Sequence, residues 1–307
     1  MPSRADIQNE VFRLRNQSQD LVRRAYLKKL NEKTGRDTLI YASSFTSAKI
    51  QNIPPYLLSI TTEDIQGFMA ALHGLKGKQL DLILHSPGGS LEAAEQIVQY
   101  LRAKYDHVRA LIPQNAMSAA TMIACACDEI VMGKQSALGP IDPQITFPTQ
   151  TGQRTAAAQD LLKEFEQAKL EVESNPKLAP IWVTKIKDYP PGILNLCKRT
   201  TDLAIEKVAA WLKAYMFKGQ ADGEAKAEKI ARWLGNAEEH KTHGRPVGLA
   251  VATDLGLNVV PMEQDDELQD LILSVFHSTA VTFDITPCIK FVENHNARGW
   301  FLSPATS

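Results

Sequence analysis

Apolar residues occur along this chain in short continuous runs, separated by longer segments in which apolar and polar positions alternate with helical periodicity. Short runs bounded by turn-forming residues predict buried strands. These runs are 38–42, 80–84, 108–113 and 129–132. The segments between them predict helices, at 62–73, 91–101 and 119–127. Because strands alternate with helices, we expect an α/β fold with a mainly parallel sheet and right-handed crossovers.

The pattern changes after residue 150. Segment 146–155 is polar and rich in turn residues, and it predicts a mobile loop. Helical periodicity then dominates, at 156–173, 204–217 and 224–234. The end of the chain predicts a short helix, a strand, a final helix and a late strand, at 246–255, 257–260, 265–276 and 289–293. We expect the tail after Gly299 to be loose.

These elements suggest three parts of the chain. Residues 1–36 would form an N-terminal helical arm, since one charged amphipathic helix is predicted over 5–33. Residues 37–262 would form the main domain, with a helical insertion at about 150–240. Residues 263–307 would supply the C-terminal helix and tail. The arm could pack on a neighbouring subunit or lie solvated on its own domain.

The most unusual chemistry lies at the end of the strand at 80–84. His85-Ser86-Pro87-Gly88-Gly89-Ser90 follows that strand, and the two glycines allow positive φ and leave backbone N–H groups uncovered. Ser90 is a suitable N-cap for the helix that comes next. A strand, a Gly-Gly turn and a helix therefore place bare N–H donors at the edge of a sheet, where they could bind a developing oxyanion.

A second segment repeats this layout after the strand at 108–113. Asn115-Ala116-Met117-Ser118-Ala119-Ala120-Thr121 places Ser118 where the strand gives way to a helix of small residues. A serine at that point has an exposed oxygen and the positive end of a helix beside it. The alternative is that Ser118 is only an N-cap, which is common at helix starts.

The two segments in this order resemble the Clp-type serine peptidases, which share the crotonase-like fold. The resemblance rests on S-P-G-G-S, A-M-S-A-A-T and C-D-E-I-V-M, within 39–142, with an echo in G-R and G-L at 240–260. Within that superfamily the chain is most similar to the serine dehydrogenase proteinase family, which is related to signal-peptide peptidase A. The resemblance implies a ClpP/crotonase-like fold with repeated β-β-α units and an ATP-independent serine endopeptidase that assembles into homo-oligomers.

A serine hydroxyl needs a base to act as a nucleophile. In Clp peptidases a histidine follows the serine, and the acid comes from the later region. Here Asp142 stands 24 residues after Ser118, and H-K-T-H supplies His240 and His243 in the later region. The resembled family has the order Ser, Asp, His, which this chain matches. We therefore expect a Ser118–His243–Asp142 triad.

Other bases remain open at this stage. His240 is the alternative within the same motif, and a Ser–Lys dyad like that of signal-peptide peptidases would use Lys163. A lysine desolvated on a helix could act as a base, although most lysines on such helices are solvated charges. The oxyanion donors expected beside these groups are Gly88 or Gly89, together with Ala119.

Composition narrows the function classes. The 307 residues include 34 Lys and Arg against 35 Asp and Glu, so no overall charge favours nucleic acid or an anionic membrane. No P-loop motif is present, and no cofactor or metal is expected. No transmembrane segment or signal peptide is predicted, although many relatives of this kind are membrane-anchored. Four cysteines without a C-x-x-C motif favour reduced thiols and a cytoplasmic protein.

Two rival functions share this fold. An acyl-CoA transforming enzyme would use the oxyanion donors on a thioester carbonyl, but Ala119 and Ala120 leave no carboxylate at the serine turn. A catalytically silent scaffold or partner-binding subunit would tolerate replacement of Ser118. A fold alone does not decide between these rivals and a peptidase acting on peptides or proteins.

Overall fold

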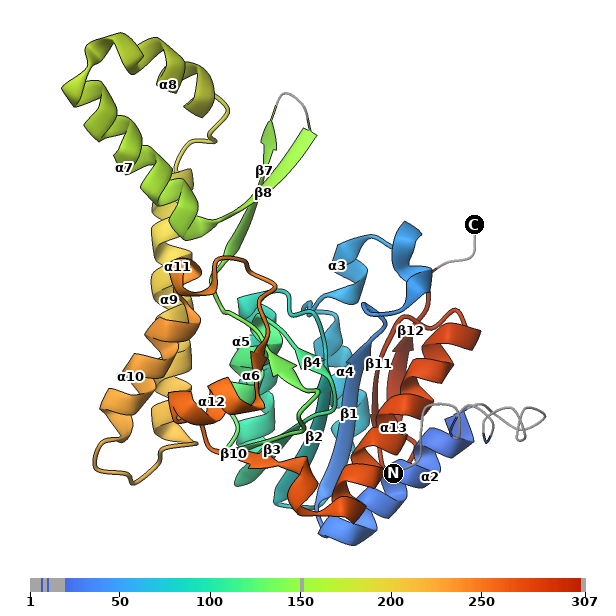
Figure 1. Ribbon diagram of the computed structural model, residues 1–307. Helices are drawn as coiled ribbons and strands as arrows, with labels where there is room; N and C mark the ends of the chain where they lie inside the picture. The colour runs from blue at the N-terminus through green and yellow to red at the C-terminus, as the bar shows by residue number, and fades with distance from the viewer. Residues whose placement is uncertain (1–6, 8–9, 11–19, 150–151, 305–307) are drawn as a thin grey trace.

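A seven-stranded, mainly parallel sheet forms the centre of the computed structural model, which describes residues 7, 10, 20–149 and 152–304 (Figure 1). The strand order is β10-β5-β3-β2-β1-β11-β12. Five neighbouring strands are parallel: β10 (Val259–Pro261), β5 (Glu129–Met132), β3 (His107–Ile112), β2 (Gln79–His85) and β1 (Asp37–Ser43). The expected α/β fold is confirmed, and each of these strands lies within two residues of its predicted position.

The sheet continues with two antiparallel strands from the end of the chain. β11 (Lys290–Asn294) pairs with β1, and β12 (Gly299–Leu302) pairs with β11. The expectation of a loose tail after Gly299 is therefore wrong as far as Leu302. Trp300 lies opposite Val292 in this hairpin, and pairing with a buried strand orders a segment whose own sequence has no clear strand period.

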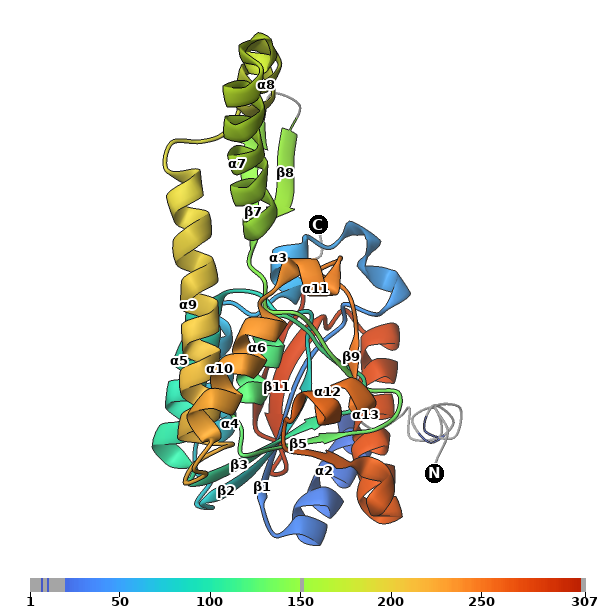
Figure 2. The same ribbon diagram turned by 60° about the vertical axis from the view of Figure 1, so that its left-hand side comes forward.

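Helices cover both faces of the sheet, which explains the continuous apolar runs of its strands. In β1, Leu39 and Tyr41 face one core, and Ile40 and Ala42 face the other. The first core is closed by α4 (Asp64–Leu72), α5 (Leu91–Lys104), α6 (Ala119–Cys125), α9 (Ile193–Ala214) and α10 (Gly223–Leu234). The second core is closed by α2 (Asp20–Thr34) and α13 (Asp266–Ile285), which lie side by side in Figures 1 and 2.

The described part of the predicted N-terminal helix, α2, packs against α13. Its Arg23 is fully buried and forms an ion pair of 2.8 Å with Glu293 of β11. Most of the rest of the predicted helix, including 11–19, lies outside the described residues. The division into an arm, a main domain and a C-terminal part stays a prediction.

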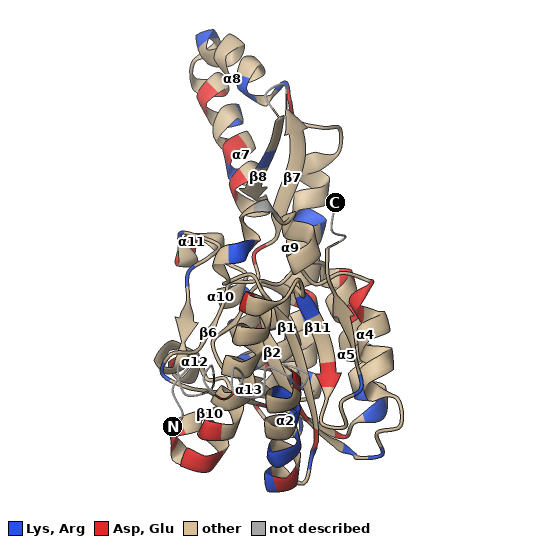
Figure 3. Ribbon diagram, turned by 90° about the vertical axis from the view of Figure 1, so that its right-hand side faces the viewer, with Lys and Arg blue, Asp and Glu red and all other residues tan. Residues whose placement is uncertain are grey.

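Residues 144–193 form an extension that projects from the sheet domain (Figures 1 and 2). It contains the hairpin β7 (Gln144–Thr149) and β8 (Gly152–Ala157), then α7 (Ala158–Ser174), a 3-10 turn (Pro176–Leu178) and α8 (Ala179–Ile186). The extension shares a small core with the start of α9, made by Phe147, Ala158, Leu161, Ile193 and Cys197. Lysines and acidic residues are mixed along α7 (Figure 3).

The mobile loop expected at 146–155 is instead largely strand. Thr146 pairs with Thr155, and their hydroxyl oxygens are 2.8 Å apart. Ile145 and Phe147 alternate with Gln144 and Thr146 in β7, but Pro148 interrupts this short pattern and most of β8 is exposed, so the sequence did not predict the hairpin. One cross-strand threonine pair and one aromatic anchor stabilise it in place of a continuous apolar face.

A small second sheet connects distant segments above the main sheet. β4 (Asn115–Ala116), β6 (Ala137–Leu138) and β9 (Val247–Gly248) lie in this order. The remaining short elements are a 3-10 turn (Ala48–Asn52), α3 (Pro55–Leu58), α11 (Ala237–His240), α12 (Leu249–Leu255) and a 3-10 turn (Met262–Gln264). In the described part of the chain, no helix combines the length and the apolarity needed to cross a bilayer.

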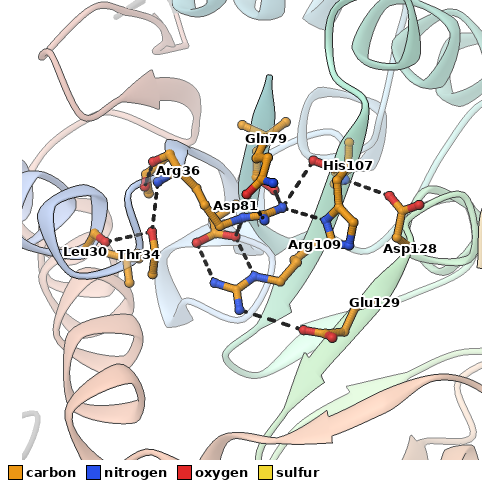
Figure 4. A network of polar contacts seen from close by, with 12 residues as sticks. Leu30, Thr34, Arg36, Gln79, Asp81, His107, Arg109, Asp128 and Glu129 are labelled. Carbon is orange, nitrogen blue, oxygen red and sulfur yellow. Dashed lines mark hydrogen bonds and ion pairs between the residues drawn. The ribbon is translucent and has the colours of Figure 1, made fainter. Parts of the chain in front are cut away.

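A buried ionic network lies where β2 and β3 begin (Figure 4). The carboxylate of Asp81, which is fully buried, accepts hydrogen bonds from Arg36 at 2.7 Å and from Arg109 at 2.7 and 2.8 Å. The Gly-Gly turn lies at the opposite, carboxyl end of β2. The network therefore ties strands together at the edge of the sheet that does not carry the candidate site.

Candidate active site

Two turns meet at the carboxyl ends of β2 and β3. Ser86, which follows β2, forms a parallel bridge with Ala116 of β4. The Ser86 N–H donates to the Asn115 carbonyl at 3.1 Å, and the Met117 N–H donates to the Ser86 carbonyl at 3.0 Å. Because the carboxyl ends of neighbouring parallel strands share one edge, the turn at 86–90 and the turn at 115–118 are held against each other.

Ser118 has a backbone conformation that L-residues rarely adopt. Its φ is 52° and its ψ is −120°, and it immediately precedes α6. Its side chain makes no capping hydrogen bond, so the interpretation of Ser118 as a simple N-cap does not match the structure. Strained residues of this kind cost about 1–3 kcal/mol and concentrate at functional sites. The turn exposes the hydroxyl instead of using it for the helix.

Gly88 lies directly against this serine turn. A Cβ on Gly88 would lie 2.5 Å from the Met117 carbonyl oxygen and 2.6 Å from Ser118 Cβ, and the φ of Gly88 is 92°. Both the space and the backbone conformation therefore require glycine. The absence of a side chain at residue 88 allows the two turns to touch.

Gly89 offers an N–H group toward the site. On one side of the turn, the Ile60 N–H donates to the Gly88 carbonyl at 2.7 Å, and the Ser90 N–H donates to the Ile60 carbonyl at 2.9 Å. In this parallel pattern the Gly89 N–H points away from Ile60. The Gly88 N–H is used, since it donates to Ser86 Oγ at 3.2 Å. Among the described residues, no acceptor pairs with the Gly89 N–H.

Ala119 offers a second N–H group. It is the first residue of α6, where backbone N–H groups have no partner within the helix. Its nitrogen would lie 2.8 Å from a Cβ on Gly88, so it faces the Gly-Gly turn. The N–H groups of Gly89 and Ala119 thus flank Ser118, an arrangement that can stabilise negative charge on a carbonyl oxygen.

A carboxylate–imidazole pair comes from two loops that the small sheet brings together. Leu138 of β6 pairs with Val247 of β9, so the segments that follow β6 and precede β9 lie side by side. His243 Nδ1 lies 2.8 Å from Asp142 Oδ1. Asp142 is buried, and the side chain of His243 is 31% exposed. Since Nδ1 faces the carboxylate, the opposite ring nitrogen, Nε2, is left for another group.

The second oxygen of Asp142 is also held. Gln144 Nε2 donates to Asp142 Oδ2 at 2.7 Å, which fixes the carboxylate plane while Oδ1 faces His243. Gln144 is the first residue of the β7 strand. Sequence reasoning missed Gln144, because an amide two residues after an aspartate has no distinctive pattern.

These groups share one cavity of about 540 Å³. Ser118, Ala119, Gly88, Gly89 and His243 all line it. Its apolar walls come from the sheet domain and from α9, and they include Leu91, Met122, Ile141, Leu203 and Ala204. Tyr56, Gln144 and Thr146 line it as well. A cavity of this size, lined by both apolar walls and polar side chains, has the dimensions of a ligand or substrate site.

The alternative bases lie elsewhere, and the described lining of the cavity contains neither of them. His240 Nε2 lies 2.9 Å from the Trp233 carbonyl, its ring packs on Trp233, and burial lowers its pKa. Lys163 is half exposed on α7 and pairs with Glu238. Among the described residues that line the cavity, Ser118 is therefore the candidate nucleophile and His243 the candidate base.

His85 precedes the Gly-Gly turn but faces away from the candidate site. Its ring packs between Phe45 and Phe276, and Nε2 lies 3.3 Å from Thr46 Oγ1. Burial lowers its pKa to about 3, so it is neutral at physiological pH. His85 therefore has a structural position beside α13.

Comparisons with known proteins identify the family of this chain. A family model described as ClpP-like SDH-type serine proteinase matches residues 11–175, which is more than half of the chain. The uncharacterized protein MJ0137 of Methanocaldococcus jannaschii is 31% identical over 78% of this chain and 73% of its own length. MJ1495 of the same organism is 31% identical over 67% of this chain and 61% of its own length.

Two solved structures show a weaker likeness. A mutant of the 1510-N membrane-bound stomatin-specific protease has a TM-score of 0.41 and 16% identity, over 69% of this chain and 79% of that one. A second mutant of that protease, in complex with a substrate peptide, has a TM-score of 0.41 and 18% identity, over 68% and 74% of the two chains. The family assignment rests on the sequence match: this chain belongs to the ClpP-like SDH-type serine proteinases.

Proposed function

We propose that the protein is a serine endopeptidase in which Ser118 is the nucleophile, His243 the general base and Asp142 the group that orients the imidazole. The observation that carries this proposal is the 2.8 Å contact between Asp142 Oδ1 and His243 Nδ1, at a cavity that Ser118 also lines. The hydrogen bond to Asp142 selects the tautomer in which Nε2 can accept the Ser118 proton.

The reaction would follow the chemistry of acyl transfer. Ser118 Oγ attacks the scissile carbonyl carbon, and its proton passes to His243 Nε2. The carbonyl oxygen becomes an oxyanion that accepts hydrogen bonds from the Gly89 and Ala119 N–H groups. When the C–N bond breaks, the imidazolium gives its proton to the leaving amine. A water molecule then repeats the same steps on the acyl-enzyme and releases Ser118.

Gly89 is a better donor candidate than Gly88. The Gly88 N–H is bonded to Ser86 Oγ, whereas the Gly89 N–H points away from Ile60, and Gly89 lines the same cavity as Ser118. The proposed reaction consumes no nucleotide, because each step uses only protein groups, the peptide and water. ATP-independent cleavage of a peptide or protein is therefore part of the proposal.

The first test is labelling of the purified protein by a fluorophosphonate probe without added nucleotide. We expect the wild type to be labelled, and Ser118→Ala and His243→Ala to lose labelling. Ser59→Ala is the matched control, since Ser59 lines the same cavity and its hydroxyl donates to the Pro55 carbonyl. The control should be labelled like the wild type.

The other outcomes separate the rivals. Loss of labelling in Ser118→Ala alone would transfer the role of base to His240 or Lys163. A folded wild type without labelling would contradict the proposed peptidase, and it would favour a silent scaffold or an acyl-CoA enzyme. Hydrolysis of an acyl-CoA thioester by the wild type, with no cleavage of peptides, would identify the protein as an acyl-CoA enzyme.

We also propose that the protein forms homo-oligomers in a reducing, cytoplasmic compartment. Large apolar side chains are exposed on the extension, including Leu170 on α7 and Ile181 and Val183 on α8. Their burial between copies would remove apolar surface from water. The four cysteines are buried and unpaired, as expected for reduced structural thiols. Light scattering of the wild type and of Ile181→Glu would test assembly, and cell fractionation would test the location.

A further inference from the structure

A buried ion pair outside the cavity lies close behind the Gly-Gly turn. Lys290 Nζ, on β11, is 2.8 Å from Asp64 Oδ1, at the start of α4. The two side chains are 1% and 0% exposed. Neither residue belongs to the motifs of the proposed triad. Because removing two charges from water costs about as much as their attraction returns, a buried pair is weak evidence of a stabilising role and invites a more specific one.

Both members of the pair hold the segment at 59–61. Lys290 Nζ donates to the Ser59 carbonyl at 2.9 Å, and Asp64 Oδ2 accepts the Thr61 N–H at 2.8 Å. The same oxygen of Asp64 accepts the Tyr41 hydroxyl at 2.9 Å, and burial raises the pKa of Tyr41 so that it remains a donor. Ile60 is thus flanked by two anchored peptide groups.

The anchored segment braces the turn that carries the proposed oxyanion donor. The Ile60 N–H bonds to the Gly88 carbonyl, and the Ile60 carbonyl bonds to the Ser90 N–H, one on each side of Gly89. A Cβ on Gly89 would lie 2.3 Å from the Ile60 oxygen and 2.4 Å from its nitrogen. The backbone of Gly89 therefore lies flat against Ile60, and the orientation of its N–H depends on the position of Ile60.

We propose that Lys290 and Asp64 are positioning residues for catalysis, which fix the Gly89 N–H through Ile60. The inference rests on the proposed function, in which that N–H group binds the oxyanion. An oxyanion-hole donor must be held in place before the charge develops, because its contribution depends on preorganisation. Lys290 bonds to the Ser59 carbonyl and Asp64 bonds to the Thr61 N–H, and these two bonds supply that rigidity.

The test compares two buried cations that form ion pairs on opposite faces of the same sheet, Lys290 and Arg23. Lys290→Met removes the proposed anchor, and Arg23→Met removes a fully buried cation that pairs with Glu293 of β11 on the other side of the sheet. Both variants should lose thermal stability. At a temperature where both are folded, only Lys290→Met should lower kcat for a peptide ester, by about 10-fold to 100-fold, with KM within about 2-fold. Lys290→Arg, which keeps the charge and the donors, should restore part of kcat.

Two measurements keep the test decisive if Lys290→Met does not fold. Asp64→Asn keeps the size of the side chain and should show the same loss of kcat. In the wild type, hydrogen exchange should show the Ile60 and Ser90 amides protected as strongly as those of β2, and fast exchange there would overturn the inference. Equal kcat values in the wild type, Lys290→Met and Arg23→Met would also overturn it, while fluorophosphonate labelling of Ser118 would still support the peptidase. Absence of labelling in the wild type would overturn both proposals.

Discussion

Asp142 Oδ1 lies 2.8 Å from His243 Nδ1, although 101 positions separate the two residues in the chain. Asp142 is almost fully buried, and its other oxygen accepts the Gln144 amide. The carboxylate therefore has two partners in fixed directions, and it orients the imidazole at the cavity that Ser118 lines.

Replacing Asp142 by asparagine should lower kcat for peptide cleavage by a factor on the order of 10³ to 10⁴. The amide keeps the size of the side chain, but it can donate to Nδ1 and favour the tautomer in which Nε2 carries the proton. The measurement is kcat on a peptide ester, with exposed Asp160 on α7 as the site of the control, Asp160→Asn. Unchanged kcat in Asp142→Asn would exclude Asp142 from the triad.

Gln144→Leu should lower kcat by about 10-fold without loss of thermal stability. The variant removes the donor to Asp142 Oδ2, so the carboxylate plane is no longer fixed and the imidazole is held less well. Gln153→Leu, at an exposed position of β8 in the same hairpin, is the matched control and should keep full kcat. Equal losses in the two variants would show that the hairpin surface, and not the amide, is responsible.

Gly88→Ala should abolish fluorophosphonate labelling while the protein remains folded. The added Cβ would collide with the Met117 carbonyl and with Ser118 Cβ, so the serine turn must move. Gly256→Ala is the control for backbone strain, since Gly256 has a similar φ of 96° and no atom within 4 Å of an added Cβ. It should lose stability by about 1 kcal/mol and keep its labelling. Labelling of Gly88→Ala at the rate of the wild type would contradict close contact between the two turns.

His85 should make the protein less stable in mild acid. Burial lowers its pKa from 6.5 to about 3, so the folded state keeps the ring neutral while the unfolded chain takes up a proton below pH 6.5. The free energy of unfolding should fall through this window by up to about 1.4 kcal/mol per pH unit. His85→Gln lacks this titration. On going from pH 7 to pH 5, its free energy of unfolding should therefore rise by about 2 kcal/mol relative to that of the wild type. Urea denaturation at both pH values measures the difference, and a constant difference would show that His85 titrates alike in both states.

Much of the fold could be predicted from the sequence, since it depends on local patterns. Apolar runs bounded by turn residues located the parallel strands, because a strand buried on both faces is apolar throughout. Ser118, Gly88 and Gly89 could be singled out because a strand, a tight turn and a helix occupy adjacent positions in the chain. The hairpin β7–β8 and the strand β12 were not predicted, because pairing with a partner strand stabilises them. The alternation in β7 is short and ends at Pro148, and β8 has no apolar face.

The choice among possible bases needed the tertiary structure. The sequence favoured His243 but left His240 and Lys163 open, since spacing along a chain does not determine distance in space. Pairing of Leu138 with Val247 brings His243 to Asp142. His240 lies only three residues before His243 in the same motif, yet its side chain faces the Trp233 carbonyl. The proposed supports of the Gly89 turn likewise come from separate segments of the chain, Ile60, Asp64 and Lys290, which only the tertiary packing brings together. Local chemistry was therefore determined by the sequence, and the partnership of distant residues was decided by the sheet and the loops that it aligns.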